Sequence, residues 1–373
     1  MRTPSPAPRT RTVLFIHGFL DDETVWDDVI SALPGDVDTV RYGLPGFGAR
    51  TADGSVDISL ASLAAEAAEL IADVDSDVVV VGQSMGSQVA ELIGAAHPGK
   101  VTGLVLITPV PLTGTRLPDE ALTPFRQLGG HPDAQRAARA QLSPKLSDDQ
   151  LDRLTQAGAS ARPDVVSHYV DVWNDGVADA PPVSAFTGPV RLIRGGADPF
   201  VTAELLATLS PRFPQAEEQV IDGGGHWVHV EYADRVAAAI TAFTHQTGAA
   251  VSWRRSFAEK SQARFAETFA EHVVFEATTL PDSVEGRDQV AAIMGAASTI
   301  YESLEFTSEA HSGSTSYLQW RATAFGDMAM RGITVLDRDA DGKVVKIAIH
   351  HRPLGAVLRF AEEIRKRTET AAS

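Results

Sequence analysis

Short runs of apolar residues recur along the first two thirds of the chain, and each run ends in glycine or polar residues. Such runs lie at residues 13–16 and 78–81, and a third at 190–193 is interrupted only by Arg191. Continuous apolar runs of this length are typical of strands buried on both faces of a parallel sheet. Stretches of helical character, at residues 22–33 and 202–209, lie among them. The alternation predicts an α/β fold with a doubly wound sheet.

The alternation is interrupted between about residues 110 and 186. This segment has a mostly helical pattern and is rich in proline. Proline ends helices or begins them, so the segment should contain several short helices rather than one long one. It therefore predicts a helical insertion outside the alternating core.

A different pattern begins after a helix that is predicted to end near His245. The small residues at 247–252 predict an interdomain linker between one domain at 12–246 and another at 253–373. In the second domain helical patterns come first and strand-like runs follow. That order indicates an α+β domain.

The second domain opens with an aromatic pattern. Phe257, Phe265 and Phe269 recur on one predicted helical face over residues 254–273, and residues 281–298 predict a second helix. An amphipathic helix ends the chain. The strand-like runs between them lie around residues 304–309, 316–324, 328–337 and 344–352.

The composition is that of an ordinary globular protein, with 44% hydrophobic and 7% aromatic residues. A chain of 373 residues exceeds the usual size of one core, which agrees with two domains. The formal net charge of −17 argues against nucleic acid or an anionic membrane as partner, because both require clustered Lys and Arg. A small neutral or lipophilic substrate is expected.

Missing sequence features set further expectations. The chain has no cysteine, which excludes a thiolate nucleophile and a zinc-thiolate site, and neither a metal nor a cofactor is expected. Residues 1–12 lack the apolar core of a secretory signal. No apolar run approaches the roughly 20 residues that span a bilayer. A cytoplasmic location is the default expectation.

The chemistry centres on the sequence Gly-Gln-Ser-Met-Gly at residues 82–86, which follows the apolar run at 78–81. A serine between two glycines at the end of a buried strand can occupy a strained turn that exposes its hydroxyl, as in a nucleophile elbow. Asp198 and His226 each follow a later strand in a glycine-rich turn. The order Ser84, Asp198, His226 differs from the chymotrypsin-like and subtilisin-like orders.

With these motifs, residues 12–246 resemble the α/β-hydrolase superfamily. The resemblance implies that Ser84 is the nucleophile and that His226 is the general base and acid. It implies that Asp198 is the carboxylate that orients the histidine.

The resemblance also implies where the rest of the site lies. The backbone N–H groups of Phe19 and Met85 would form the oxyanion hole. The insertion at 110–186 would be a cap over the active site, although core packing is the alternative role for each of its aromatic residues. The aromatic residues expected to contact substrate are Phe125, Tyr169, Trp173 and Trp227.

Asp198 has alternatives that the sequence leaves open. It could instead cap the helix predicted at 202–209. Asp222 is a rival acid, but it lies on the same turn as His226 and is too local to approach the imidazole from the far side. Some relatives carry the acid one strand earlier, where this chain has Thr108.

Three other side chains have structural roles in this interpretation. His17 is predicted to hold the oxyanion loop through a backbone hydrogen bond. Trp26 is predicted to anchor the core under the first helix, because large aromatic residues pack more often than they bind ligands. His229, at the opening of the next helix, is predicted to lie on the surface.

Residues 252–366 resemble the SnoaL-like, or nuclear-transport-factor-2-like, fold, in which a curved sheet wraps around helices as a cone. The resemblance rests on the order of elements and on Gly-Arg-Asp at 286–288 and Asp-Gly-Lys at 341–343. His350 and His351 are adjacent on a strand, so at most one enters the cone. Because the fold hosts enzymes and binding modules alike, we favour a binding or self-association module that forms a homodimer.

The predicted function is hydrolysis of a carboxylic ester, thioester or lactone through an acyl-enzyme. Hydrolysis of a diketone carbon–carbon bond and peracid formation need the same three residues. A ligand-binding protein on the hydrolase fold is one alternative. A bifunctional hydrolase plus cyclase or isomerase that acts on a polyketide-like metabolite is another. Retention of all three residues and both elbow glycines favours the enzyme.

Overall fold

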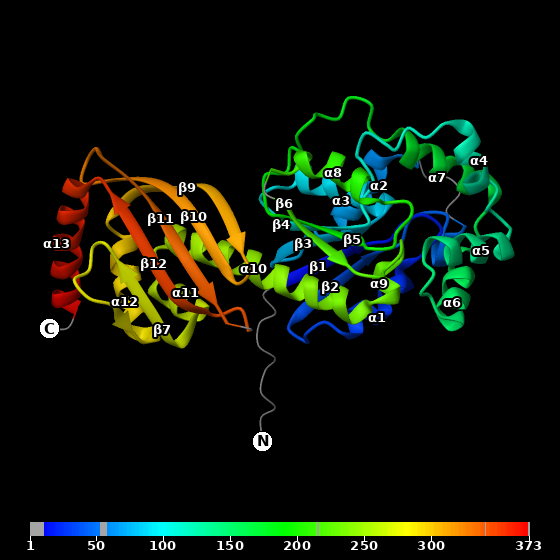
Figure 1. Ribbon diagram of the computed structural model, residues 1–373. Helices are drawn as coiled ribbons and strands as arrows, with labels where there is room; N and C mark the ends of the chain where they lie inside the picture. Colours follow the sequence, from blue (N-terminus) through cyan, green and yellow to red (C-terminus); the bar gives the residue numbers. More distant parts are fainter. Residues whose placement is uncertain (1–10, 53–57, 215, 340, 372–373) are drawn as a thin grey trace, which may run out of the picture. The chain divides into compact units, whose positions relative to one another are not determined.

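The computed structural model describes residues 11–52, 58–214, 216–339 and 341–371 (Figure 1). Its contacts divide the chain into two compact units, Met1–Thr244 and His245–Ser373. Within the described part of the chain, no helix combines the length and the apolar character needed to cross a bilayer.

The first unit is built on a six-stranded sheet in the order β2-β1-β3-β4-β5-β6, and every neighbouring pair is parallel. Side chains alternate across β3, so that Val78 and Val80 face one core cluster while Val79 and Val81 face another. Burial on both sides explains the continuous apolar run. The strands are β1 (Arg11–Ile16), β2 (Val37–Tyr42), β3 (Asp77–Gln83), β4 (Val101–Ile107), β5 (Val190–Gly195) and β6 (Ala216–Ile221).

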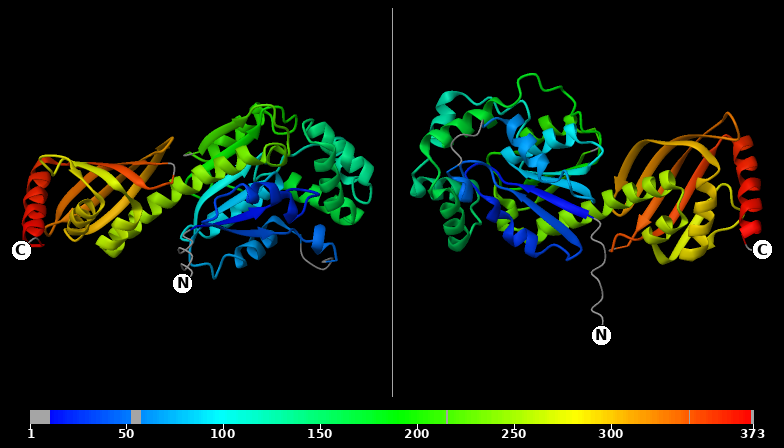
Figure 2. Two further views of the ribbon diagram at one scale, coloured as in Figure 1. Left: turned by 90° about the horizontal axis from the view of Figure 1, so that it is seen from below. Right: turned by 180° about the vertical axis from the view of Figure 1, so that it is seen from behind.

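Helices cover both faces of this sheet, which confirms the α/β prediction (Figure 2). One face carries the 3-10 turn η1 (Glu23–Trp26), α1 (Asp27–Ser31), α9 (Val228–Glu231) and the start of α10 (Ala233–Glu259). The other face carries α2 (Leu60–Glu69), α3 (Met85–Ala96) and α8 (Ala203–Leu209).

Four helices are inserted between β4 and β5 and form the cap. A single side chain on α3, Gln88, contacts the start of this insertion and its last helix. Its Nε2 donates to the carbonyl of Pro111 at 2.7 Å and to that of Trp173 at 3.1 Å. The cap is therefore fastened to the helix that begins directly after Ser84. Its helices are α4 (Asp119–Arg126), α5 (Pro132–Leu142), α6 (Asp148–Ala159) and α7 (Pro163–Asp175).

The second unit is a six-stranded sheet in the order β8-β7-β12-β11-β10-β9, antiparallel except for the pair of β12 and β7. Burial alternates along β10, where Leu318, Trp320 and Ala322 face the core. A half-buried curved sheet with helices on one side fits the SnoaL-like prediction. The elements are α11 (Gln262–Thr268), β7 (Phe269–Ala277), β8 (Val284–Glu285), α12 (Arg287–Ser298), β9 (Tyr301–Ser312), β10 (Thr315–Ala324), β11 (Met328–Arg338), β12 (Val344–Arg352) and α13 (Leu354–Ala371).

Two predictions around the boundary differ from the structure. Residues 247–252, predicted as a linker, lie inside α10, because a run that contains alanine is as compatible with a helix as with a loop. The single helix predicted over 254–273 is instead the end of α10, then α11, then the first part of β7. Phe257 and Phe269 do share one core cluster, but they reach it from different elements.

His229, predicted to be on the surface, is fully buried, whereas Trp26 is in the core as predicted. The two rings pack against each other at a tilt of 38°, with centroids 4.7 Å apart, because α9 packs against η1. Neither ring nitrogen of His229 has a hydrogen-bond partner among the described residues. Burial, and to a lesser extent the charge of His226, lowers the pKa of His229 to about 3.

We expect His229→Leu to make the first unit less sensitive to acid. The unfolded chain binds a proton at this histidine near pH 6.5, whereas the folded unit does not until the pH is much lower, so stability falls as the pH drops. Between pH 6.5 and 5 this group should cost the wild type about 2 kcal/mol. Calorimetric unfolding of the full chain across this range measures the effect. His229→Gln should share the flatter pH dependence, and slopes equal to that of the wild type would contradict the prediction.

In the second unit, Gly332→Ala should destabilise the sheet. A Cβ on Gly332 would lie 2.2 Å from the carbonyl oxygen of His350 and 2.3 Å from the Trp320 ring. Overpacking of this kind costs about 1–3 kcal/mol. Gly355→Ala is the matched control, since among the described residues no atom lies within 4 Å of its added Cβ. Urea unfolding followed by tryptophan fluorescence should separate the two variants, and equal midpoints would sink the idea.

Candidate active site

Ser84 lies between β3 and α3 in a strained conformation, with φ 50° and ψ −121°. Few residues other than glycine adopt a positive φ, and such strain tends to occur at functional sites. The flanking glycines make the turn possible. A Cβ on Gly82 would lie 2.2 Å from the carbonyl oxygen of Gly86, and one on Gly86 would lie 2.5 Å from that of Ile16. Both glycines of the motif are therefore required sterically.

The structure brings the three residues predicted from sequence into one hydrogen-bonded series. His226 Nε2 lies 3.0 Å from Ser84 Oγ, and His226 Nδ1 lies 2.9 Å from Asp198 Oδ2. All three side chains are buried. An ionised carboxylate only accepts hydrogen bonds, so Nδ1 donates to Asp198 and Nε2 is left to accept from the serine hydroxyl. This is the tautomer that a general base requires.

Asp198 is held as a carboxylate. Burial alone would raise its pKa, but the charge and hydrogen bond of His226 and the N–H groups of Phe200 and Val201 lower it, and the net direction is down. The two N–H groups donate to Oδ1 at 2.8 and 3.0 Å. Thr202, not Asp198, caps α8.

The rival acid positions have other surroundings. Both ring nitrogens of His226 are engaged by Ser84 and Asp198, so Asp222 is not the imidazole's partner. Thr108, where some relatives carry the acid, has φ 41° and donates through Oγ1 to the carbonyl of His226 at 3.2 Å. That position therefore supports the main chain of the histidine turn.

The loop after β1 is fixed by His17. The backbone N–H of Leu44 donates to His17 Nε2 at 2.9 Å, so the ring proton sits on Nδ1 and is donated to the carbonyl of Gly18 at 2.9 Å. Burial lowers the pKa of His17 to about 4, although the bond to Gly18 and the charge of Asp22 act in the opposite direction. The neutral ring holds the loop by a backbone hydrogen bond, as predicted.

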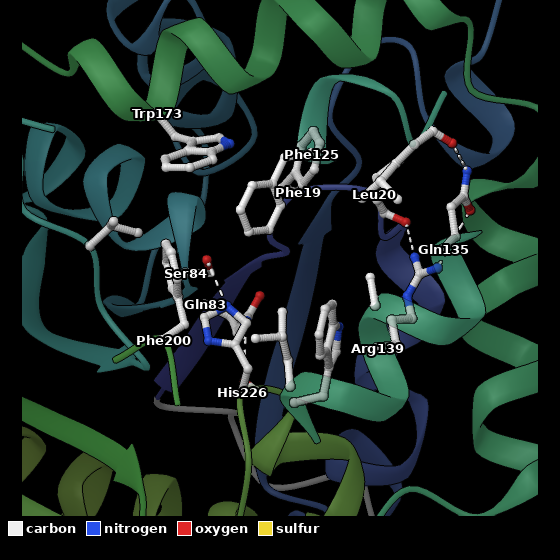
Figure 3. Close-up of a pocket in the computed structure, with 15 residues that line it drawn as sticks. Phe19, Leu20, Gln83, Ser84, Phe125, Gln135, Arg139, Trp173, Phe200 and His226 are labelled. Carbon is white, nitrogen blue, oxygen red and sulfur yellow. Dashed lines mark hydrogen bonds between the residues drawn. The ribbon is translucent and has the colours of Figure 1, made fainter. Parts of the chain in front are cut away.

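Phe19, on the same loop, lines the cavity in front of Ser84 (Figure 3). Met85 is the first residue of α3. The first N–H groups of a helix have no acceptor within it, so the N–H of Met85 is available at the positive end of the helix dipole. The two predicted oxyanion donors thus come from the loop after β1 and from the first residue of α3.

The wall of the cavity is mostly apolar. Aromatic rings pack edge to face next to the imidazole: the ring centroids of Trp173 lie 5.8 Å from Phe125 and 5.9 Å from Phe200, and Phe200 lies 5.5 Å from His226. Phe125, Trp173 and Trp227, three of the four aromatic residues predicted to contact substrate, line this cavity.

Tyr169, the fourth, lies outside the wall of the cavity. It is fully buried, its ring packs 4.8 Å from that of Phe47, and its hydroxyl donates to the carbonyl of Pro45 at 2.8 Å. A buried tyrosine hydroxyl requires a partner, and here the partner comes from the loop after β2. Tyr169 therefore belongs to the packing between cap and core.

Several lining residues were not predicted. Phe200 could have been found, because it stands only two positions after Asp198. Gln135 and Arg139 could not, because polar residues four apart on a helix ordinarily indicate a solvated face. In the structure both are buried and face the cavity from α5.

Comparison with known proteins places these features in a family. The sequence model of the Alpha/beta hydrolase family matches residues 13–239, and that of the SnoaL-like domain matches residues 250–347. Lipase LipV of Mycobacterium tuberculosis is 32% identical over 244 residues, covering 61% of this chain and 91% of the lipase. Pimeloyl-[acyl-carrier protein] methyl ester esterase of Aromatoleum aromaticum is 27% identical over 255 residues, covering 61% of this chain and 96% of the esterase.

Among solved structures, the bromoperoxidase of Bacillus anthracis superposes with a TM-score of 0.56 at 17% identity, covering 63% of this chain and 91% of the other. At that identity the likeness shows the fold alone. The match to the family model, in contrast, extends over more than half of the chain. This protein therefore belongs to the alpha/beta hydrolase family and is a hydrolase.

Proposed function

We propose that this hydrolase cleaves a carboxylic ester, thioester or lactone with a neutral, apolar acyl group through an acyl-enzyme on Ser84. The observation that carries the proposal is the hydrogen-bonded series from Ser84 through His226 to Asp198. Ser84 and His226 line an apolar cavity (Figure 3). A hydrogen bond that served only to stabilise the fold would not require Ser84 to adopt a strained backbone conformation beside that cavity.

In the first step, Ser84 Oγ attacks the carbonyl carbon while its proton passes to His226 Nε2, 3.0 Å away. The imidazolium that forms is stabilised by the carboxylate of Asp198. Because the pKa of Asp198 is lowered, the carboxylate is ionised at neutral pH and can serve in this way. The imidazolium then gives its proton to the leaving oxygen or sulfur.

The negative charge that develops on the substrate oxygen needs fixed donors. We assign this role to the N–H groups of Phe19 and Met85, the second of which also carries the positive end of the α3 dipole. In the second half of the reaction, His226 takes a proton from a water molecule as the water oxygen attacks the acyl carbon. The imidazolium then gives that proton to Ser84 Oγ as the acyl–Oγ bond breaks, so the acid leaves and Ser84 is restored.

The substrate class follows from the wall of the cavity and from the relatives. Aromatic and aliphatic side chains dominate the lining, which favours an uncharged acyl or alcohol group. The formal net charge of −17 disfavours an anionic substrate. Since the relatives are named a lipase and a methyl ester esterase, an oxygen ester is the first choice within the class.

For the second unit we propose a role in binding or self-association. His351, the one of the two adjacent histidines that turns inward, is joined to the Tyr301 hydroxyl by a 3.0 Å hydrogen bond. Its ring also packs 5.2 Å from Trp320 and 5.5 Å from Phe360. Aromatic packing around this pair favours a filled interior over a second active site.

Ser84→Ala should abolish labelling by a fluorophosphonate probe. It should also lower the turnover of short and medium p-nitrophenyl esters by about 10⁴-fold or more. Intact-mass analysis of the full chain measures the label, and wild type should gain a single adduct. A folded wild-type protein that gains none would refute the acyl-enzyme and would make a ligand-binding protein the better interpretation.

Asp198→Asn should lower kcat by about 10⁴-fold, because the amide no longer imposes the correct tautomer on His226. Asp222→Asn is the matched control on the neighbouring turn and should retain wild-type kcat. Steady-state hydrolysis of p-nitrophenyl butyrate measures both variants. A loss in the Asp222 variant with a retained rate in the Asp198 variant would reassign the acid.

A further inference from the structure

The cap meets the core of the site at a buried ion pair between Arg139 and Asp21. Arg139 on α5 is 2% exposed, Asp21 after the Phe19 loop is 1% exposed, and Arg139 Nη2 lies 3.3 Å from Asp21 Oδ1. Burial raises the pKa of Asp21 to about 6, although Arg139 and the hydrogen bond from Trp227 lower it. Such a pair contributes little net stability, so its presence here calls for another reason.

On one side, Arg139 holds the loop that carries Phe19. Its Nη2 donates to the carbonyl of Leu20, a residue with φ 64° that directly follows Phe19. Gln135, one turn earlier on α5, helps to hold the guanidinium in place. Its Oε1 accepts a hydrogen bond from Arg139 Nη1 at 3.5 Å. Gln135 Nε2 donates to the carbonyls of Leu128 and Gly158 at 2.9 and 3.0 Å.

On the other side, the same pair reaches the turn that carries His226. Trp227 Nε1 donates to Asp21 Oδ2 at 2.8 Å, and the Arg139 guanidinium lies 5.6 Å from the Trp227 ring centroid. The end of α5 adds main-chain support. The His226 N–H donates to the carbonyl of Leu142 at 2.9 Å.

We propose that Arg139 is a positioning residue, which sets the spacing between the Phe19 loop and the His226 turn from the cap through Leu20, Asp21 and Trp227. The proposal rests on the proposed ester hydrolysis, because both loops then contribute to one transition state. Donors misplaced by about 1 Å cost roughly 100-fold in rate even when substrate still binds. The α5 side of the cap is accordingly a fixed wall of the cavity.

The test is a double substitution, Arg139→Met with Asp21→Asn, which removes both charges together and leaves no buried charge unpaired. The Asn oxygen can still accept from Trp227. We expect kcat for p-nitrophenyl butyrate and the rate of fluorophosphonate labelling each to fall 10- to 100-fold, with KM changed less than threefold. The single variant Arg139→Lys should have a rate between that of the wild type and that of the double variant, since lysine keeps the positive charge but lacks the planar fork.

A second buried ion pair in the same unit provides the matched control. Arg212 Nη2 lies 2.6 Å from Glu91 Oε1, both residues are buried, and neither lines the cavity. Arg212→Met with Glu91→Gln should change the unfolding temperature about as much as the substitutions in the Arg139 pair do, but leave kcat unchanged at 25 °C.

The outcomes separate the two proposals. Wild-type labelling together with an unchanged kcat in the Arg139 double variant would overturn the positioning role and leave ester hydrolysis intact. Equal losses of kcat in both double variants would reduce Arg139 to a stabilising residue and would also overturn it. Absence of labelling in the wild type would overturn the proposed function and the positioning role together.

Discussion

The site depends on a contact between main-chain atoms, in which the start of α3 lies directly against the end of β1. Gly86 leaves no room for a side chain beneath the carbonyls of Ile16 and His17. This close approach places the N-terminus of α3, at Met85, beside the loop that leads to Phe19. The strain at Ser84 is one consequence, and it persists because parallel strands on both sides of β3 fix the strand that precedes it.

The sequence predicted that Ser84, Asp198 and His226 lie together because each follows a strand, and the strands of a parallel sheet end at the same edge. The structure places the three side chains within hydrogen-bonding distance of one another in series. Local signals of that kind fail when a side chain's partner comes from a distant loop. Tyr169 has the same aromatic character as Trp173, yet it bonds to Pro45 and so faces the core.

Failures elsewhere have a similar cause. The sequence did not predict that Arg139 on α5 is buried. Its charge is paired with Asp21, which lies more than a hundred positions away along the chain. In the second unit, apolar and polar residues alternate along β10, with Leu318 and Trp320 on the buried face. This alternation predicts a strand. The stretch at 247–252 gave no comparable signal, because its small residues suit a helix and a linker equally.

The attachment of the cap through Gln88 bears on how such an enzyme can change its substrate. Everything between Pro111 and Trp173 is held at its two ends by one amide group on α3. Helices other than α5 can be lengthened, shortened or exchanged between those ends without moving the strand, turn and helix that carry Ser84. New specificity can therefore arise from changes in α4, α6 and α7, whereas α5 is constrained because it contacts the Leu20 carbonyl and supplies the Leu142 carbonyl to the His226 N–H.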